Sequence, residues 1–312
     1  RPTYMMQWNL SYQRQLGKDW LVSVNYLGNK TTHIWGAYDI NPAIYIPGSS
    51  ASTNQRRPLY LQNPAQGQFY SGINQADDGG SSHYNGVLSS VQHRFANSFT
   101  LLANYTWSHC ISDIDFQGEL AAPLYQNQNN RAGERGSCIF DHRSIFNSSA
   151  VAVFPAFQNA LLSRIASGWQ IAPIFTAASG APITLTDGGR DISMTGALQD
   201  RPNVISTKVY PDKQTVNQWI NTAAFAVQPT GAFGNLGRTS LVGPGSWNVD
   251  VSLSRTFKPT ERLGVELRAD SFNILNHPNW NAPAVSIASS TFGQITSFSS
   301  PRIIQLATKL RW

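Results

Sequence analysis

The last residues of the chain alternate between apolar and polar side chains, and this pattern restricts the fold more than any other feature. Counted back in steps of two, one set is Trp312, Leu310, Thr308, Leu306 and Ile304, and all but Thr308 are apolar. The residues between them are largely polar and include Lys309 and Arg311. A period of two is the period of a β-strand. The pattern fits a strand between lipid and a wet lumen, or the last strand of a soluble sandwich.

The composition favours the membrane barrel. Charged residues make up 13% of the 312 residues, against roughly 25% in ordinary soluble proteins. Small polar residues supply the polarity instead, and aromatic residues reach 11% with 9 Trp. Few charges and many aromatics suit a polar lumen, an apolar band and aromatic girdles.

The charge and hydropathy patterns exclude several other classes. The net charge is +6, but Lys and Arg are scattered with no run beyond Arg56-Arg57, so nucleic acid is not an expected partner. The sequence contains no stretch of 18 consecutive apolar residues, so no transmembrane helix is predicted. The start, Arg1-Pro2-Thr3-Tyr4, has no signal-peptide pattern, so we expect a mature exported protein or a fragment.

The same alternation recurs along the chain and predicts nine strands. They cover residues 4–16, 20–28, 84–95, 99–107, 144–154, 168–178, 247–257, 263–275 and 303–312. Turns such as Gly17-Lys18-Asp19 join them in hairpins, and Pro173 makes its strand less certain. Long polar connections, predicted to lack regular structure, separate the hairpins at about 29–83, 108–143, 179–246 and 276–302.

Short turns at one end and long loops at the other are typical of an outer-membrane barrel. The predicted fold class is therefore all-β, an antiparallel transmembrane β-barrel segment with long extracellular loops. If Trp312 lies at the periplasmic rim and successive strands alternate in direction, a chain of nine strands begins on the extracellular side. Single-chain bacterial barrels have even strand numbers, and an open sheet exposes two edges to lipid. We expect the C-terminal portion of a larger barrel.

Specific strings resemble Oar-like TonB-dependent receptors of the acidobacterial type. Together they span most of the chain, from about residue 4 to residue 312. They are 4–17 (YMMQWNLSYQRQLG), 233–238 (FGNLGR), 243–245 (GPG), 247–253 (WNVDVSL), 267–278 (LRADSFNILNHP) and 292–295 (FGQI). A final strand that ends on an aromatic resembles the closing strand read by the barrel-assembly machinery, which makes Leu306, Leu310 and Trp312 the insertion signature.

The resemblance implies a plug inside a barrel of about 22 strands. It implies ligand capture by extracellular loops and TonB-driven uptake of a siderophore, an oligosaccharide or a peptide. Residues 1–312 match the C-terminal part of such a barrel, and the plug, the TonB-binding segment and the N-terminal regulatory-like domain are expected to be absent. The expected surroundings are lipid and lipopolysaccharide of the bacterial cell outer membrane.

Two sets of loop residues are candidates for structural or binding roles. Cys110 and Cys138 lie in one predicted loop and form either a disulfide, which an oxidising compartment favours, or two free thiols. Loop aromatics either contact a small ligand or pack each loop on itself. They are Trp35, Tyr38, Tyr45, Tyr60, Tyr70 and Tyr125.

Chemistry beyond binding is not indicated. There is no GxSxG, HExxH, Walker or dinucleotide motif, so neither an enzyme nor a cofactor is predicted. Calcium needs six to eight oxygens, and each candidate cluster offers two carboxylates, so surface turns are expected. The clusters are Asp77 with Asp78, Asp113 with Asp115, and Asp187 with Asp191.

Two other functions stay open at this point. One is an adhesive or structural outer-membrane barrel that does not transport, and it differs by the absence of a plug upstream. The other is a soluble secreted β-sandwich that binds carbohydrate, and it predicts solubility without detergent.

Overall fold

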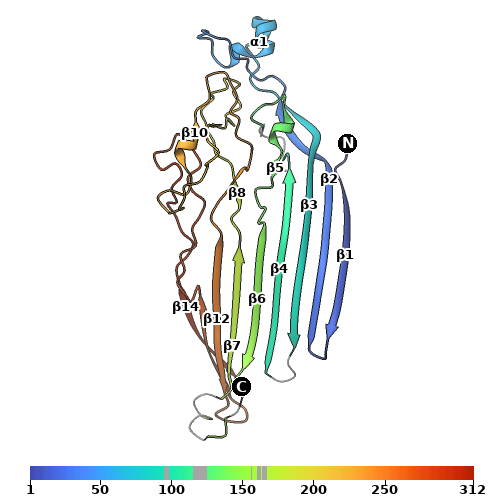
Figure 1. The fold of residues 1–312 in the computed structure, drawn as a ribbon, viewed down its shortest axis with the longest axis vertical. Coiled ribbons are helices and arrows are strands. Elements are labelled where there is room, and N and C mark those ends of the chain that lie inside the picture. Colours follow the sequence, from blue (N-terminus) through green and yellow to red (C-terminus); the bar gives the residue numbers. More distant parts are fainter. Residues whose placement is uncertain (95–97, 115–124, 156, 160–162, 164–166) are drawn as a thin grey trace.

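Nine long antiparallel strands form one curved sheet in which each strand pairs with its neighbour in sequence (Figure 1). The computed structural model describes residues 1–94, 98–114, 125–155, 157–159, 163 and 167–312. The strands are β1 (Tyr4–Leu16), β2 (Trp20–Asp39), β3 (Asn74–Arg94), β4 (Phe99–Ser112), β6 (Ser144–Val153), β7 (Trp169–Ala178), β12 (Ser246–Phe257), β13 (Gly264–Phe272) and β14 (Ile303–Arg311). The nine predicted strands are confirmed. The expected turn at 96–98 lies largely outside the described residues.

The remaining elements are short and belong to the long connections. β5 (Gly136–Ser137) pairs with the upper part of β4, and two small sheets stand apart from the large one. These pair β8 (Pro182–Ile183) with β11 (Leu241–Val242), and β9 (Asn203–Val204) with β10 (Phe225–Ala226). The helices are η1 (Asn54–Arg56), α1 (Pro58–Gln62), α2 (Pro64–Gly67), η2 (Arg131–Glu134) and η3 (Thr222–Ala224).

The register carries two chemically different faces across the whole sheet. Side chains directly opposite each other on paired strands point to the same side. The apolar face, as we call it, carries Leu10, Tyr26, Val87, Trp107, Phe146, Phe175, Val249, Leu253 and Leu306. The polar face carries Ser11, Asn25, Asn104, Asn147, Thr176, Asn248, Asp250, Glu266 and Gln305.

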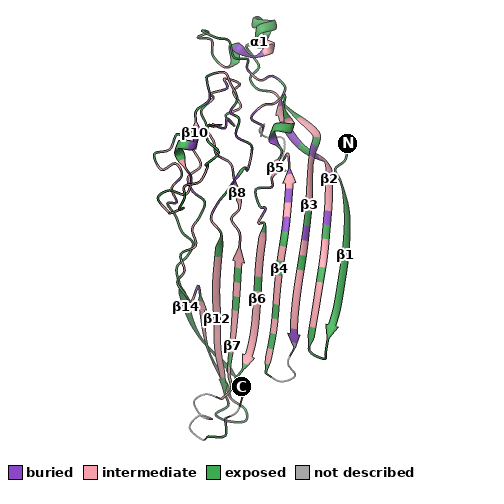
Figure 2. Cartoon of the chain, in the orientation of Figure 1, coloured by how far each residue is buried: buried purple, intermediate pink, exposed green. Residues whose placement is uncertain are grey.

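Large hydrophobic side chains on the apolar face are not covered by protein. Leu10 is 71% exposed and Leu306 is 78% exposed, and every residue of β1 is exposed (Figure 2). A continuous exposed apolar surface of this size marks a site of contact with a membrane or another protein. Among the described residues, no helix is long and apolar enough to cross a membrane.

Carboxylates are confined to the polar face in the straight parts of the strands. A bulge interrupts the β2–β3 register above Thr32. Below this bulge, the nine strands contain only Asp250, Glu266 and Asp270 as acidic residues within the described chain, and all three point to the polar face. Arg268 bonds Asp270, and Arg311 bonds Glu266. Burying unpaired charge in lipid is costly, so this segregation fits a wet lumen.

The prediction that the connections lack regular structure is wrong where two strands extend into them. β2 and β3 continue above the predicted ends, to Asp39 and from Asn74. The apolar alternation fades there, but the backbone ladder does not depend on it. The connections also pack around a hydrophobic cluster of their own. It consists of Ile183, Leu185, Ile220, Ala224, Phe225, Leu236 and Leu241.

The doubtful strand around Pro173 is present, with a local defect. β12 pairs along the whole of β7, and Val251 stands opposite Pro173. The β6–β7 register passes from Ser149 opposite Ile174 to Ala152 opposite Ile171, so that ladder is interrupted beside the proline. Proline lacks the N–H that would donate there.

Candidate ligand-binding surface

The connections above the sheet are tied together by buried polar contacts. The Arg201 guanidinium donates to both carboxylate oxygens of Glu134, at 2.6 and 3.0 Å, and both side chains are almost fully buried. Gln126 bonds the same pair of segments, because its side chain accepts from Arg201 N at 2.8 Å and donates to Gly234 O at 3.0 Å. A bidentate charged pair fixes geometry as well as distance. Residues 125–143, before β6, and residues 184–240, after β8, are therefore joined, and we call them together the loop unit.

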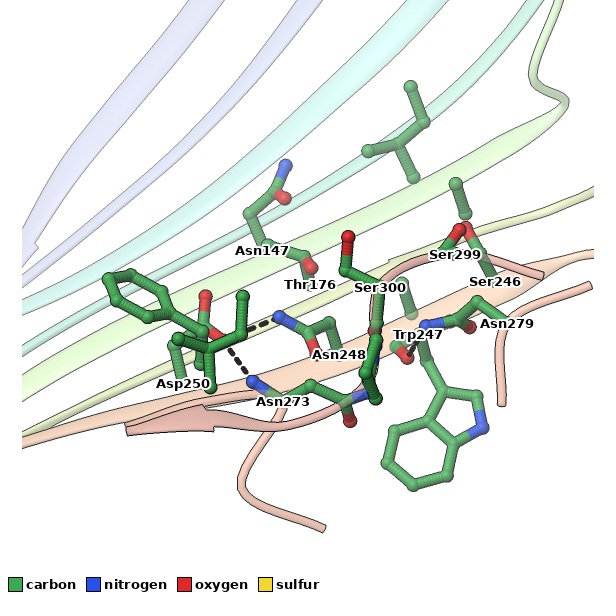
Figure 3. A pocket seen from close by; sticks show the side chains of 16 residues that line it. Asn147, Thr176, Ser246, Trp247, Asn248, Asp250, Asn273, Asn279, Ser299 and Ser300 are labelled. Carbon is green, nitrogen blue, oxygen red and sulfur yellow. Dashed lines mark hydrogen bonds between the residues drawn. The ribbon is translucent and has the colours of Figure 1, made fainter. Parts of the chain in front are cut away.

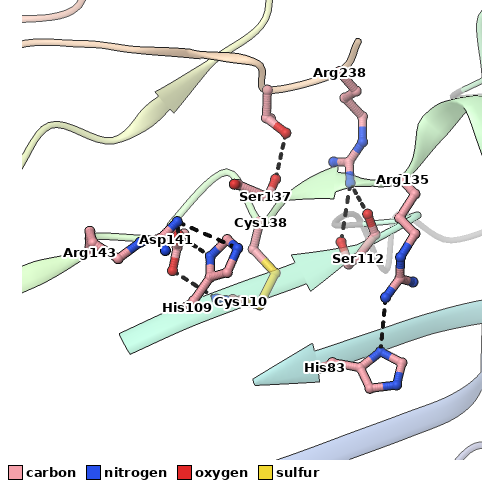
Figure 4. Close-up of a disulfide and its surroundings, with 11 residues drawn as sticks. His83, His109, Cys110, Ser112, Arg135, Ser137, Cys138, Asp141, Arg143 and Arg238 are labelled. Carbon is pink, nitrogen blue, oxygen red and sulfur yellow. Dashed lines mark hydrogen bonds and ion pairs between the residues drawn. A yellow bond between two sulfur atoms is a disulfide. The ribbon is translucent and has the colours of Figure 1, made fainter. Parts of the chain in front are cut away.

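A disulfide fastens the same region to the sheet (Figure 4). It joins Cys110 near the end of β4 to Cys138 just after β5, with the two Cα atoms 5.3 Å apart. Cys138 N also donates to Cys110 O at 3.0 Å. The Asp141 carboxylate accepts from Cys110 N at 2.9 Å and contacts His109 Nδ1 at 3.0 Å. Residues 138–141 are thereby held against the end of β4.

A polar pocket of about 420 Å³ opens on the polar face where β6, β7 and β12 approach the loop unit (Figure 3). The register places Asn147, Thr176 and Asn248 in one row across the three strands. Residues 299–301 and the segment after β13 close its other side. Uncharged amides and hydroxyls therefore dominate this part of the lumen wall.

Hydrogen bonds hold the pocket side chains in fixed directions. Asp250 Oδ1 accepts from Asn248 Nδ2 at 2.6 Å and from Asn273 N at 2.8 Å. Asn279 accepts from Trp247 N and donates to Trp247 O, both at 2.9 Å. Convergent amide groups on a rigid wall are suited to ligands rich in hydroxyl or amide groups.

Hydrogen bonds from two asparagines in the string 267–278 fix the turn that follows β13, beside this pocket. Asn273 and Asn276 adopt left-handed backbone angles, with φ of 49° and 51°, a conformation that Asn tolerates better than most residues. Asn273 Nδ2 donates to His277 O, and Asn273 Oδ1 accepts from His277 N, both at 2.9 Å. Asn276 Oδ1 accepts from Arg302 N at 3.0 Å. The asparagines thus join the end of β13 to the start of β14.

Five of the six candidate loop aromatics are at least partly accessible. All five lie on β2 or in the connection between β2 and β3, while the polar pocket lies on β6, β7 and β12. Trp35, Tyr45 and Tyr70 are exposed, and Tyr38 and Tyr60 are half-buried. Tyr125 is only 3% exposed, with the Arg131 guanidinium 5.6 Å from its ring centre. Burial raises the pKa of Tyr125 to about 12. Tyr125 is therefore a packing residue and is removed from the ligand candidates.

In the candidate calcium clusters, Asp77, Asp78 and Asp113 each have a different partner within the protein. Asp77 pairs with Arg131, Asp78 with the N-terminal amine, and Asp113 accepts from Ser81 N. Asp115 lies outside the described residues. Across the described residues, no group of three His, Cys, Asp or Glu is placed to hold a metal.

Asp187 corrects the expectation of surface turns at these clusters. It is fully buried and accepts from Gln228 Nε2 at 2.7 Å. Burial raises the pKa of Asp187 and also that of Asp200, the second buried carboxyl in the loop unit.

Periodicity did not point to the Arg201–Glu134 pair or to the pocket. The pair joins residues 67 positions apart, and the pocket combines three strands with a distant loop. The one sequence feature near the pocket that could have drawn attention is the group of asparagines at 273–281. Such a group indicates tight turns rather than a binding site.

Comparison with known proteins agrees with this architecture. A family model described as an outer membrane beta barrel domain matches residues 1–305. No curated protein matches the chain. The chain is similar to the outer membrane transporter YddB from Escherichia coli, with 9% identity and a TM-score of 0.55 over 99% of this chain. It also matches BauA, the ferric preacinetobactin receptor from Acinetobacter baumannii, with 11% identity and a TM-score of 0.48 over 98% of this chain.

The chain spans 32% of YddB and 29% of BauA, or about a third of these proteins. At 9% identity, the likeness to YddB shows a shared fold and nothing about the ligand. It fits a sheet that forms part of a large barrel wall.

Proposed function

The chain belongs to the family of outer membrane β-barrel domains, and from this premise we propose that it is the C-terminal part of the barrel of a TonB-dependent receptor. Family membership places it in the bacterial outer membrane. The soluble β-sandwich considered from the sequence is wrong, because the nine long strands form one sheet with an uncovered apolar face rather than two packed layers.

The observation that carries the proposal is the division of the sheet into two faces. The apolar face meets lipid, while the polar face carries the described carboxylates and the amide-lined pocket below the loop unit. Polar residues that line a lumen, joined to ordered loops at one end, are the parts that a receptor needs to capture a ligand.

The open edges of the sheet support a larger barrel. In the described part of the chain, β1 pairs only with β2, and β14 pairs only with β13. Unpaired backbone groups cannot remain exposed in hydrocarbon. Strands from the rest of a longer protein would complete a barrel of about 22 strands, and a plug in its lumen would carry the contact with TonB.

In this proposal the chain binds and admits a ligand without covalent chemistry, so it is not an enzyme. The loop unit and the exposed aromatics Trp35, Tyr45 and Tyr70, on β2 and in the β2–β3 connection, capture a siderophore, an oligosaccharide or a peptide, and TonB drives its uptake. The strings quoted above favour the Oar-like type of receptor. Barrel-assembly machinery would insert the chain through its last strand, with Leu306, Leu310 and Trp312 as its signature.

Uptake by cells tests this function. Cells that express the full-length protein should take up one of three labelled probes: a ferric catecholate siderophore, maltoheptaose or a mixed oligopeptide. Uptake should stop when a protonophore removes the energy supply or when TonB is deleted. Uptake that continues without TonB would contradict energised transport. Binding of intact cells to surfaces, with no uptake of any probe, would favour the non-transporting adhesive barrel.

A further inference from the structure

An aromatic row on the apolar face marks the upper border of the membrane. Trp8 lies across Gly28, and Trp8 Nε1 donates to Tyr26 Oη at 3.3 Å. Tyr26 Oη donates to Asn85 Oδ1 at 2.8 Å, and Trp107 stands opposite Val87 in the adjoining row. Rings with one apolar body and one bonded polar edge favour the membrane–water interface. From Trp8 down to Leu16 the strand covers about 26 Å along its own axis. At the tilt of roughly 40° that barrel strands have, this corresponds to a height of about 20 Å, of the same order as the apolar band of about 25 Å.

Basic side chains gather directly above this row, on the same face. Lys30 stands opposite His83, one alternation above Gly28, and Arg135 Nη2 lies 3.4 Å from His83 Nδ1. Next to them, Arg143 Nη2 lies 3.5 Å from His109 Nε2. Figure 4 shows Arg135 directed toward His83 and Arg143 toward His109, on either side of the disulfide. We call these five residues the basic cluster.

Within the described chain, the three cations of the cluster, Lys30, Arg135 and Arg143, have one carboxylate contact between them. Within the described chain, neither Lys30 nor Arg135 has a carboxylate oxygen within 4 Å. That carboxylate is Asp141, which accepts from Cys110 N, contacts His109 and lies 3.7 Å from Arg143. The cluster thus holds more cations than carboxylates within the described chain, and such an excess of positive charge attracts anions from outside the protein.

A cleft beside the cluster has room for such an anion. It measures about 420 Å³ and lies above the ends of β6 and β7, between β5 and the β8–β11 pair. Arg135 and Arg143 line it together with Arg238 and hydroxyl groups. Arg238 is turned toward Glu134 O and the Ser112 oxygens, so Arg135 and Arg143 supply the available charge. Guanidinium and hydroxyl groups together recognise phosphate oxygens.

We propose that the basic cluster binds the phosphate groups of lipopolysaccharide in the outer leaflet. The aromatic row fixes the depth, and phosphates of the outer-leaflet headgroups lie at the level of Lys30, Arg135 and Arg143. The disulfide holds Arg135 and Asp141 against β4, so the site is built before the lipid arrives. This site depends on the membrane location alone and not on the transport proposed above.

Binding of purified lipopolysaccharide to the full-length protein in detergent tests the site. The variant K30Q/R135Q/R143Q should bind phosphorylated rough lipopolysaccharide at least about tenfold more weakly than the native protein, since each cation near such a surface contributes to the attraction. Dephosphorylated lipopolysaccharide should bind the native protein as weakly as it binds the variant. The control K213Q/K258Q/R262Q removes the same charge from exposed loop and turn positions and should bind like the native protein.

Three results would overturn the proposal. They are equal affinity of native protein and variant, equal affinity for phosphorylated and dephosphorylated lipid, and displacement of the lipid by millimolar inorganic phosphate, which would indicate a free-anion site. Heat-modifiable migration in electrophoresis checks that each variant is folded. If the triple Gln variant does not fold, K30R/R135K/R143K should retain binding, and R135Q alone should weaken it several-fold.

Discussion

At the scale of single residues, the buried bidentate contact between Arg201 and Glu134 joins two segments of the loop unit. Removing one member of a buried ion pair leaves the other charge without compensation and costs about 3–5 kcal/mol. Glu134→Gln should therefore make the loop unit open more easily, and proteolysis of the folded protein in detergent should become faster. Asp212→Asn breaks the exposed Lys208–Asp212 pair and should change little. Equal cleavage rates in both variants would contradict this role.

Asp187 predicts a pH dependence of the loop unit. Burial raises the pKa of this carboxyl above its ordinary value of 3.8, so the folded loop unit holds the proton more tightly than the unfolded chain does. Its contribution to stability is fully present below the unfolded-state pKa and is lost as pH rises through the folded-state pKa. Asp187→Asn should thus protect the loops from proteolysis at pH 8 and have little effect near pH 3. The same difference between variant and native protein at both pH values would refute the assignment.

At the scale of the element, β14 offers a matched pair of neighbouring positions on opposite faces. Leu306 faces outward on the apolar face, whereas Gln305 stands opposite Asp270 on the polar face. Leu306→Arg should lower the free energy of unfolding in lipid vesicles by about 2–4 kcal/mol if it lies near the bilayer midplane. Gln305→Arg should cost much less, because the lumen is wet and Asp270 is opposite. Denaturant titration followed by Trp fluorescence measures both, and a reversed order would mean that the faces are exchanged.

The Cys110–Cys138 disulfide predicts a second effect at this scale. It closes a segment whose ends are 28 residues apart, which corresponds to about 3–4 kcal/mol in the chain-entropy model. Cys138→Ser should expose the segment between β4 and β6 to protease while leaving the sheet intact. Mass analysis after alkylation should find no free thiol before reduction and two afterwards. Two alkylated thiols in protein that was never reduced would rule the bond out.

Strands were predictable from the sequence because the lipid and the lumen impose a strict period of two. The segment 247–257 alternates almost without exception, and the structure has β12 at Ser246–Phe257. Above the membrane a strand no longer needs one apolar face, so the part of β2 that extends to Asp39 shows no apolar alternation in the sequence. The residues that line the pocket could not be predicted from the sequence for a different reason. Asn147 and Asn279 are far apart in the sequence, and only the strand order and the segment after β13 bring them together.

At the scale of the whole molecule, the sheet divides into three levels that match an outer membrane. The lower end carries the short β1–β2 and β12–β13 turns, the middle carries the apolar face, and the top carries the loop unit held by an ion pair and the disulfide (Figure 1). Among the cations on the straight part of the apolar face, Arg14 and Arg255 lie near the lower strand ends, and Lys30 lies one alternation above Gly28. Arg255 lies over the rings of Trp169 and Phe257 at the lower border.

The central claim is that one face of this sheet meets lipid and the other meets water, and spin labels on neighbouring residues test it most directly. Labels would be placed singly at Leu253 and Leu306 on the apolar face and at Ser252 and Gln305 on the polar face, with the full-length protein in vesicles. The labels at Leu253 and Leu306 should collide with dissolved oxygen and be shielded from a water-soluble nickel reagent, and the labels at Ser252 and Gln305 should show the reverse. Equal accessibility at both members of each pair, or shielding of Leu253 and Leu306 from oxygen as in a dry protein interior, would contradict the account.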